Sequence, residues 1–169
     1  MELKKEIRSR GSTTVRIGNW VKEADESWVL TTNNSPITTT LEIGLSESSQ
    51  KLATDARGWL ETNGTTVQVA LTMAINRSRP QVVINRYELS PPQSITRTRA
   101  SRSVACCVET INITRGNNTT AASGGLTIPF KKFTGRDMNP NNPLERDLFI
   151  PDYKLGELAE VVWEPQGFV

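Results

Sequence analysis

The sequence contains no histidine, and its two cysteines, Cys106 and Cys107, are adjacent. The chain therefore cannot supply an imidazole base, a Ser-His or Cys-His nucleophile pair, or a histidine-ligated metal. Adjacent cysteines also exclude a zinc site built from two separated cysteine pairs. Neither G-x-x-x-x-G-K-[ST] nor G-x-G-x-x-G occurs. We expect no enzymatic activity, no metal and no cofactor, with a serine–lysine or paired-carboxylate site as a residual alternative.

Long apolar runs are also missing. No stretch approaches the roughly 18 apolar residues that a transmembrane helix needs, so we expect no membrane partner. The first ten residues are charged and contain no apolar core, which argues against a signal peptide there. We therefore expect the protein to be intracellular, with both cysteines reduced and pointing to opposite faces of a strand.

The length and composition favour one globular domain. The chain has 169 residues, of which 36% are hydrophobic and 22% charged. This length suits a single domain, residues 1–169, that needs no disulfide to fold. Residues 1–12 form a short basic N-terminal segment of that domain.

A period of two dominates the hydrophobic pattern. In residues 66–75 apolar side chains alternate with smaller or polar ones, which predicts a strand with one buried face: Val67, Val69, Leu71, Met73 and Ile75. The turn-like residues 76–80 and a second run, 81–89, predict a hairpin. Further strands are expected at 13–17, 27–32, 37–45, 103–115 and 126–130, with loops at 23–26 and 33–36. The fold class is mostly β, an antiparallel sheet or sandwich of about seven or eight strands.

Helices are expected to be few and short. Residues 50–60 place four apolar side chains on one helical face behind a serine cap: Leu52, Ala56, Trp59 and Leu60. Asn142-Pro143 predicts a second helix start, with Pro151 ending that helix after about two turns. Residues 152–163 fit either a C-terminal helix or a last strand. One or two short helices, some of them C-terminal, therefore accompany the sheet.

Charge is distributed in blocks although the net charge is only +2. Basic residues dominate segments 1–22 and 76–136, whereas acidic residues dominate segments 23–75 and 137–169. Such a chain can present a basic face to a polyanion and an acidic face to solvent or a neighbouring subunit. Alternatively, folding interleaves the blocks and their fields cancel.

The basic residues of segment 76–136 are mostly arginines, whose planar fork matches phosphate oxygens. We predict that six of them bind RNA: Arg77, Arg79, Arg86, Arg97, Arg99 and Arg102. Aromatic residues are scarce, and Tyr87 is the only one between Trp59 and Phe130. Without a stacking platform, such a surface is expected to contact the RNA backbone and not the bases. The alternative is that these arginines pair with acids on neighbouring strands or subunits.

The order of elements over about residues 58–130 resembles that of single-stranded RNA bacteriophage coat proteins. The matching stretches are Gly58-Trp59-Leu60, the strand at 66–75, the Arg77/Arg79 turn, the strand ending in 87–92, and 126–130. The resemblance implies a meandering antiparallel sheet, C-terminal helices that clamp a homodimer, and a shell lined with basic side chains. The chain is longer than usual for that family, and Pro151 and Gly156 are unfavourable for its C-terminal helices.

Together these features predict a viral structural protein, an icosahedral capsid or coat subunit that self-assembles and packages RNA. It would be found in the virion and assembled in the host cytoplasm, with its N-terminal basic segment as a secondary RNA contact. A jelly-roll coat of a small RNA virus satisfies the same pattern. The alternative function is a β-sandwich binding module, lectin-like or from a phage tail, that uses an exposed tryptophan: Trp20, Trp28 or Trp163.

Overall fold

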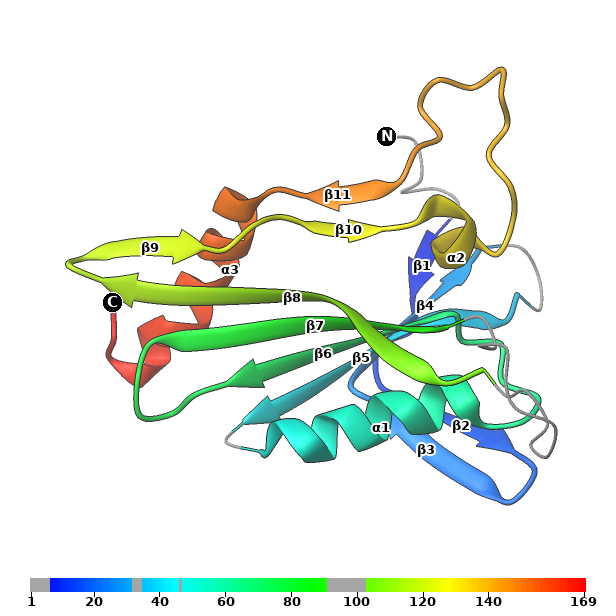
Figure 1. Ribbon diagram of the computed structural model, residues 1–169, viewed down its shortest axis with the longest axis horizontal. Coiled ribbons are helices and arrows are strands. Elements are labelled where there is room, and N and C mark those ends of the chain that lie inside the picture. Colours follow the sequence, from blue (N-terminus) through cyan, green and yellow to red (C-terminus); the bar gives the residue numbers. More distant parts are fainter. Residues whose placement is uncertain (1–6, 32–34, 46, 91–102) are drawn as a thin grey trace, which may run out of the picture.

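The computed structural model describes residues 7–31, 35–45, 47–90 and 103–169. The elements are β1 (Ile7–Ser9), β2 (Thr13–Ile17), β3 (Trp20–Ala24), β4 (Glu26–Leu30), β5 (Ile37–Leu45), α1 (Ser49–Glu61), β6 (Val69–Ile75), β7 (Gln81–Leu89), β8 (Ala105–Gly116), β9 (Thr119–Ala122), β10 (Leu126–Ile128), α2 (Phe130–Thr134), β11 (Leu148–Ile150), α3 (Asp152–Trp163) and a final 3-10 turn, Glu164–Gln166. The expected mostly β fold with a few short helices is confirmed (Figure 1). Among the described helices, none combines the length and apolar character needed to cross a bilayer.

The main sheet has seven strands in the order β1-β4-β5-β6-β7-β8-β9. The predicted hairpin is present, because β6 and β7 pair antiparallel from Ala70↔Tyr87 to Ile75↔Val82. One pair departs from the antiparallel pattern: β5 and β6 run parallel, from Thr39↔Val69 to Leu45↔Ile75. A parallel pair needs a crossover connection, and α1 supplies it. The sheet is therefore mixed.

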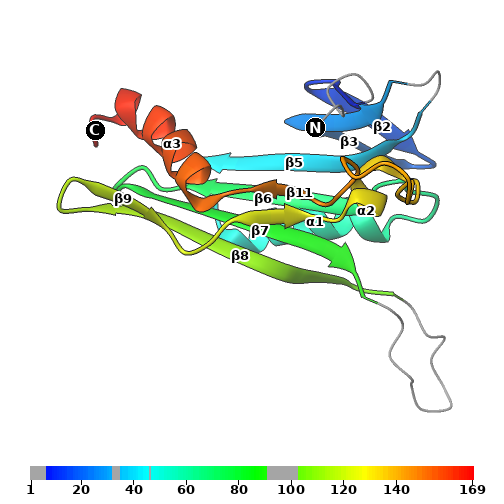
Figure 2. The same cartoon turned by 90° about the horizontal axis from the view of Figure 1, so that it is seen from above.

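Helix α1 and the β2–β3 hairpin cover one face of the sheet (Figure 2). The helix begins after Ser48, whose side chain accepts a hydrogen bond from the backbone N–H of Lys51. Its four predicted core residues, Leu52, Ala56, Trp59 and Leu60, are all buried. Small residues under the helix allow close packing, since a Cβ added at Gly44 would lie 2.9 Å from Leu52 Cδ1.

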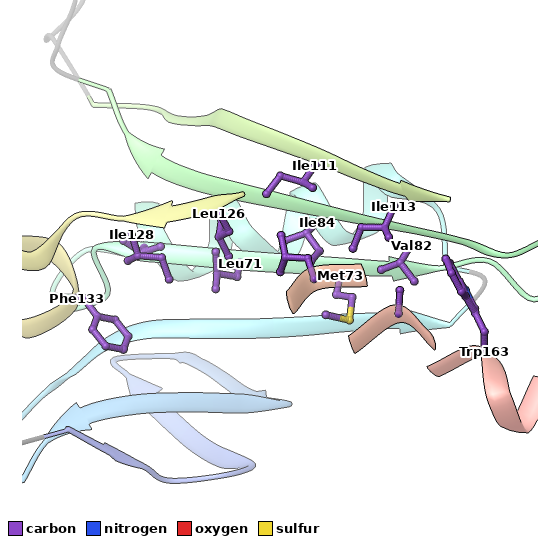
Figure 3. Close-up of a cluster of buried hydrophobic side chains, with 13 residues drawn as sticks. Leu71, Met73, Val82, Ile84, Ile111, Ile113, Leu126, Ile128, Phe133 and Trp163 are labelled. Atoms are coloured by element: carbon purple, nitrogen blue, oxygen red, sulfur yellow. The ribbon is translucent and has the colours of Figure 1, made fainter. Parts of the chain in front are cut away.

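The second face of the sheet is covered by the C-terminal third of the chain. Strands β10 and β11 form a separate two-stranded ribbon, with α2 and α3 contributing to the same apolar core. In the close-up, Leu126 and Ile128 extend from β10 toward Leu71 of the sheet, while Phe133 and Trp163 lie at opposite ends of the cluster (Figure 3). We call this second face, with its covering elements, the ribbon face.

The predicted register of residues 66–75 is confirmed at its centre. Val69, Leu71 and Met73 belong to the core of the ribbon face, and Ile75 packs against it half-buried. Val67 precedes β6 and packs instead into the core beneath α1. Thr72, one of the polar residues that alternate with these apolar ones, is also fully buried because α1 covers the opposite face of this strand.

Two local predictions are wrong. The stretch after Asn142-Pro143 is not a helix but a turn followed by β11, because Leu148 and Ile150 pair with β10 over the sheet. The loop expected at 23–26 is the end of β3 and the start of β4, with a single bend at Asp25. Residues 152–163, left open by the sequence, form α3.

The N-terminal basic segment lies partly within the described chain. Ile7–Ser9 forms the edge strand β1, which pairs antiparallel with β4. Arg8 and Arg10 are both exposed. The positively charged side chains that the structure describes in this segment therefore lie at one border of the main sheet.

Candidate nucleic-acid interface

The turn between β6 and β7 carries two of the predicted RNA-binding residues, Arg77 and Arg79. Three hydrogen bonds shape it: the Asn76 N–H donates to the Gln81 carbonyl at 3.0 Å, the Ser78 N–H to Asn76 Oδ1 at 2.8 Å, and the Gln81 N–H to the Arg79 carbonyl at 2.8 Å. Such side-chain to backbone bonds are the usual way asparagine stabilises a turn. The backbone beneath both arginines is therefore well anchored.

Both side chains point away from the protein. Arg77 and Arg79 are exposed, and neither forms a salt bridge with any residue that the structure describes. A guanidinium that is not already paired keeps its full set of donors for an external anion. Among the predicted RNA-binding residues that the structure describes, Arg77 and Arg79 are therefore the two whose guanidinium groups are available to bind phosphate.

The surroundings of this turn are of mixed charge. The β8–β9 turn, with Asn117 and Asn118 at positive φ, lies at the same end of the sheet, because β7 begins opposite the end of β8. Arg115 there is already engaged, with its guanidinium 3.2 Å from Glu160 of α3. A depression of about 330 Å³ beside the β6–β7 turn is lined by the acidic Glu47, by polar residues and by apolar ones: Asn76, Ser78, Gln81, Ala74, Ile75 and Val83.

Arg86 occupies a different environment from the turn arginines. It extends from β7 on the ribbon face, where it pairs with Glu88 and with Glu109, the latter at 3.0 Å. Lys132 of α2 pairs with the second oxygen of Glu88. Burial lowers the pKa of Lys132, and the positive charge of Arg86 adds to this effect. For Arg86 the structure shows the ion-pair arrangement that the sequence had left as the alternative.

The remaining predicted contacts, Arg97, Arg99 and Arg102, lie outside the described residues. The segment that contains them joins the end of β7 to the start of β8, so its two ends lie at the far end of the sheet from Arg77. Strand β7 has nine residues, which span roughly 30 Å. The described part of the chain therefore brings Arg77 and Arg79 together and places Arg86 apart from them.

One further charged cluster was not anticipated from the sequence. On the α1 face, Lys22 of β3 lies 3.3 Å from Glu42 of β5 and 2.8 Å from Asp55 of α1. These bonds connect the hairpin, the sheet and the helix. In the Arg86 cluster, the spacing of Arg86 and Glu88, two apart on β7, is a sequence signal for that one pair, whereas the contacts with Glu109 and Lys132 have no such signal.

The tryptophans do not form an exposed platform for a ligand. Trp163 is fully buried. Trp20 is half-buried and packs edge-to-face against the buried Trp59, with ring centroids 4.8 Å apart. Trp28 is half-buried and lies 6.5 Å from the Phe133 ring. All of them contribute to packing.

The cysteines lie on β8 and both are free and exposed. In the described ranges, no three cysteine, aspartate or glutamate side chains are grouped as metal ligands. Comparison of the chain with protein-family models, curated proteins and solved structures finds no match. The functional argument therefore depends on the residues themselves.

Proposed function

We propose that this protein is a viral structural subunit, a coat protein that self-assembles into a shell and binds RNA through exposed arginines. The main support for the proposal is the β6–β7 turn. Arg77 and Arg79 are exposed there and form no salt bridge within the described chain, and hydrogen bonds hold the backbone of the turn in place. Arginine pairs with phosphate by parallel N–H···O bonds.

The expected mode of binding is to the sugar–phosphate backbone. Neither arginine is accompanied by an aromatic ring in the turn 76–80, so the turn offers charge without base stacking. Backbone contacts release counterions and are largely independent of sequence. This mode suits a protein that encloses a whole genome.

Self-association is supported by apolar side chains left uncovered on two elements. On α3, Leu158 and Val161 are 43% and 67% exposed. On β5, Ile43 and Leu45 are 41% and 42% exposed. They lie on the ribbon face because they follow Thr39 and Leu41 at intervals of two residues along the strand. Contiguous exposed apolar surface commonly marks a protein interface.

The acidic character of α3 offers a second candidate contact for self-association. Asp152, Glu157 and Glu164 are exposed on it or directly after it, whereas the arginines of the β6–β7 turn are unpaired in the described chain. A neighbouring subunit can therefore offer an acidic surface to a basic one. In that arrangement the arginines contact a subunit and not RNA, so an Arg77→Gln/Arg79→Gln variant would keep its RNA affinity and form smaller particles.

The experiment is to express the full chain and determine its particle mass and nucleic-acid content together. The proposal predicts dimers or larger particles with high absorbance at 260 nm that falls after ribonuclease treatment. A Leu158→Ser/Val161→Ser variant should shift toward monomer, whereas Tyr153→Ser, elsewhere on the same helix, serves as the matched control. A monodisperse monomer free of nucleic acid would contradict the proposal.

A further inference from the structure

An apolar cavity of about 300 Å³ lies between the β10–β11 ribbon and the main sheet. Leu71, Met73 and Ile84 contribute from the sheet, and Leu126, Ile128 and Leu148 from the ribbon. Figure 3 shows five of these side chains converging from the two layers. Natural ligand pockets begin at about this size and are lined mainly by apolar groups.

One of the lining residues carries a buried hydroxyl that has no hydrogen-bond partner in the described chain. Thr39 lines the cavity from β5, is fully buried, and carries the one hydroxyl among the lining residues. Its Oγ1 forms no hydrogen bond within the described part of the chain. A buried hydroxyl without a partner is costly, so an oxygen-bearing guest that bonds to Thr39 would remove a penalty already present in the empty protein.

The ribbon is attached in a way that permits a guest to enter. In the described chain, β10 and β11 pair through their backbones with each other and not with the seven-stranded sheet. A hydrogen bond from the Thr127 N–H to the Glu109 carboxylate, at 3.3 Å, connects the ribbon to β8. On either side of the ribbon, the Ser123 N–H donates to the Asn112 carbonyl at 2.9 Å and Thr38 Oγ1 donates to the Phe133 carbonyl at 2.6 Å. Between these bonds, the ribbon can separate from the sheet without breaking a strand ladder.

The charges beside the cavity indicate a neutral guest. Arg86 follows Ile84 on the same strand face, and Lys132 precedes the lining residue Phe133. Both cations are paired with Glu88, and Arg86 also with Glu109. Two positive and two negative groups thus balance locally and leave no surplus charge for an ionised headgroup.

We propose that this cavity binds a small neutral amphiphile, a mainly hydrocarbon molecule whose single hydroxyl or carbonyl oxygen bonds to Thr39. An engineered cavity of about 150 Å³ accepts benzene, so a volume about twice as large suits a chain of roughly eight to twelve carbons. The inference concerns the ribbon face and is independent of RNA binding at the β6–β7 turn.

The test titrates the full-length protein with 1-octanol by calorimetry at pH 7, with octanoate as the charged counterpart. Saturable binding of one octanol per chain is expected, with octanoate at least tenfold weaker. Thr39→Val keeps the side-chain shape and should weaken octanol binding about three- to tenfold, the worth of one neutral hydrogen bond. Thr127→Val is the matched control on the opposite side of the ribbon and should bind like the wild type.

A filling variant tests the location. Leu148→Trp should abolish octanol binding. Phe149 is 61% exposed on the outer side of the ribbon, so Phe149→Ala should leave binding unchanged. No saturable binding by the wild type, or unchanged binding by both Thr39→Val and Leu148→Trp, would overturn the inference. Octanol affinity that falls with rising protein concentration would also overturn it, because a second copy would then be the occupant.

Discussion

Trp59 of α1 donates its indole N–H to the carboxylate of Glu42 on β5, so the crossover helix is bonded to the strand that precedes it. Glu42 is only 7% exposed. Burial raises the pKa of Glu42 above its usual value, although the Trp59 hydrogen bond and the charge of Lys22 oppose the shift. The folded protein therefore binds this proton more readily than the unfolded chain.

The raised pKa of Glu42 predicts that the folded protein becomes less stable as this carboxyl ionises. Since the folded pKa exceeds the unfolded value of 4.5, stability should fall as pH rises from about 4.5 through the raised pKa. Glu42→Gln retains an oxygen acceptor for Trp59 but removes the titration. Urea unfolding from pH 4 to 8 should show the wild type losing stability relative to the variant as pH rises. Parallel curves for the two proteins would contradict this account of Glu42.

Glu145 should have the opposite effect at acid pH. Two guanidinium nitrogens of Arg136 donate to it at 2.7 and 2.9 Å, and the backbone N–H of Asn139 donates at 2.6 Å. Arg136, followed by this backbone bond, lowers the pKa of Glu145 to about 2. Stability from this group is present above pH 4.5 and is lost as pH falls toward 2.

Replacing Glu145 should therefore make folding stability depend less on pH between pH 6 and pH 2. Glu145→Gln is expected to be less stable than the wild type at pH 6, with the difference disappearing between pH 4.5 and 2. Glu157→Gln is the control, because among the described residues Glu157 pairs only with an exposed lysine on the same helix, Lys154. Thermal unfolding across this range measures both, and a difference that persists at pH 2 would exclude the Arg136–Glu145 bond as its cause.

Arg86 should be required for folding stability. Arg86→Met would leave the carboxylates of Glu88 and Glu109 without their principal partner on the ribbon face. Removing one member of a buried ion pair costs about 3 kcal/mol. Arg77→Met is the matched control at an exposed site and should change stability by less than about 0.5 kcal/mol. Equal effects in urea unfolding would mean that Arg86 is as solvent-accessible as Arg77.

Thr39→Val should stabilise the ligand-free protein. The substitution removes a buried hydroxyl that has no hydrogen-bond partner in the described chain and keeps the branched shape. A gain of about 1 kcal/mol is expected, while Thr127→Val on the outer side of the ribbon should be near neutral. Loss of stability in Thr39→Val would show that the hydroxyl is satisfied in solution.

Helix α1 was predictable from local sequence, whereas its consequence for the sheet was not. The Ser48 cap and the spacing of Leu52, Ala56 and Trp59 are contained within one segment. The parallel pairing of β5 with β6 depends on where the chain returns after the helix. The return path depends on the packing of α1 and the β2–β3 hairpin against the same face of the sheet. This packing joins residues far apart in the sequence, so a local sequence pattern cannot predict it.

The wrong helix at 142–150 shows the same limit. Asn142-Pro143 is a good local helix start, but pairing with β10 buries part of Leu148 and Ile150 against the sheet. Tertiary contact outweighs the local signal there.

The predicted arginine site illustrates the limit for function. Exposure of Arg77 and Arg79 follows from their position in a polar turn. The pairing of Arg86 depends on the β7–β8 register and on Lys132 of α2, neither of which sequence spacing reveals.

The most direct test of the proposed function is the salt dependence of RNA binding by an Arg77→Gln/Arg79→Gln variant. Binding constants for several unrelated single-stranded RNAs are measured over a range of salt concentrations. The control is Arg57→Gln/Arg146→Gln, which removes the same charge from exposed sites elsewhere. Loss of two phosphate contacts should make the slope of log K against log salt shallower by about 1.4 for every RNA, with a much smaller change in the control. A slope unchanged from the wild type, or changed equally in both variants, would contradict the claim that this turn binds RNA.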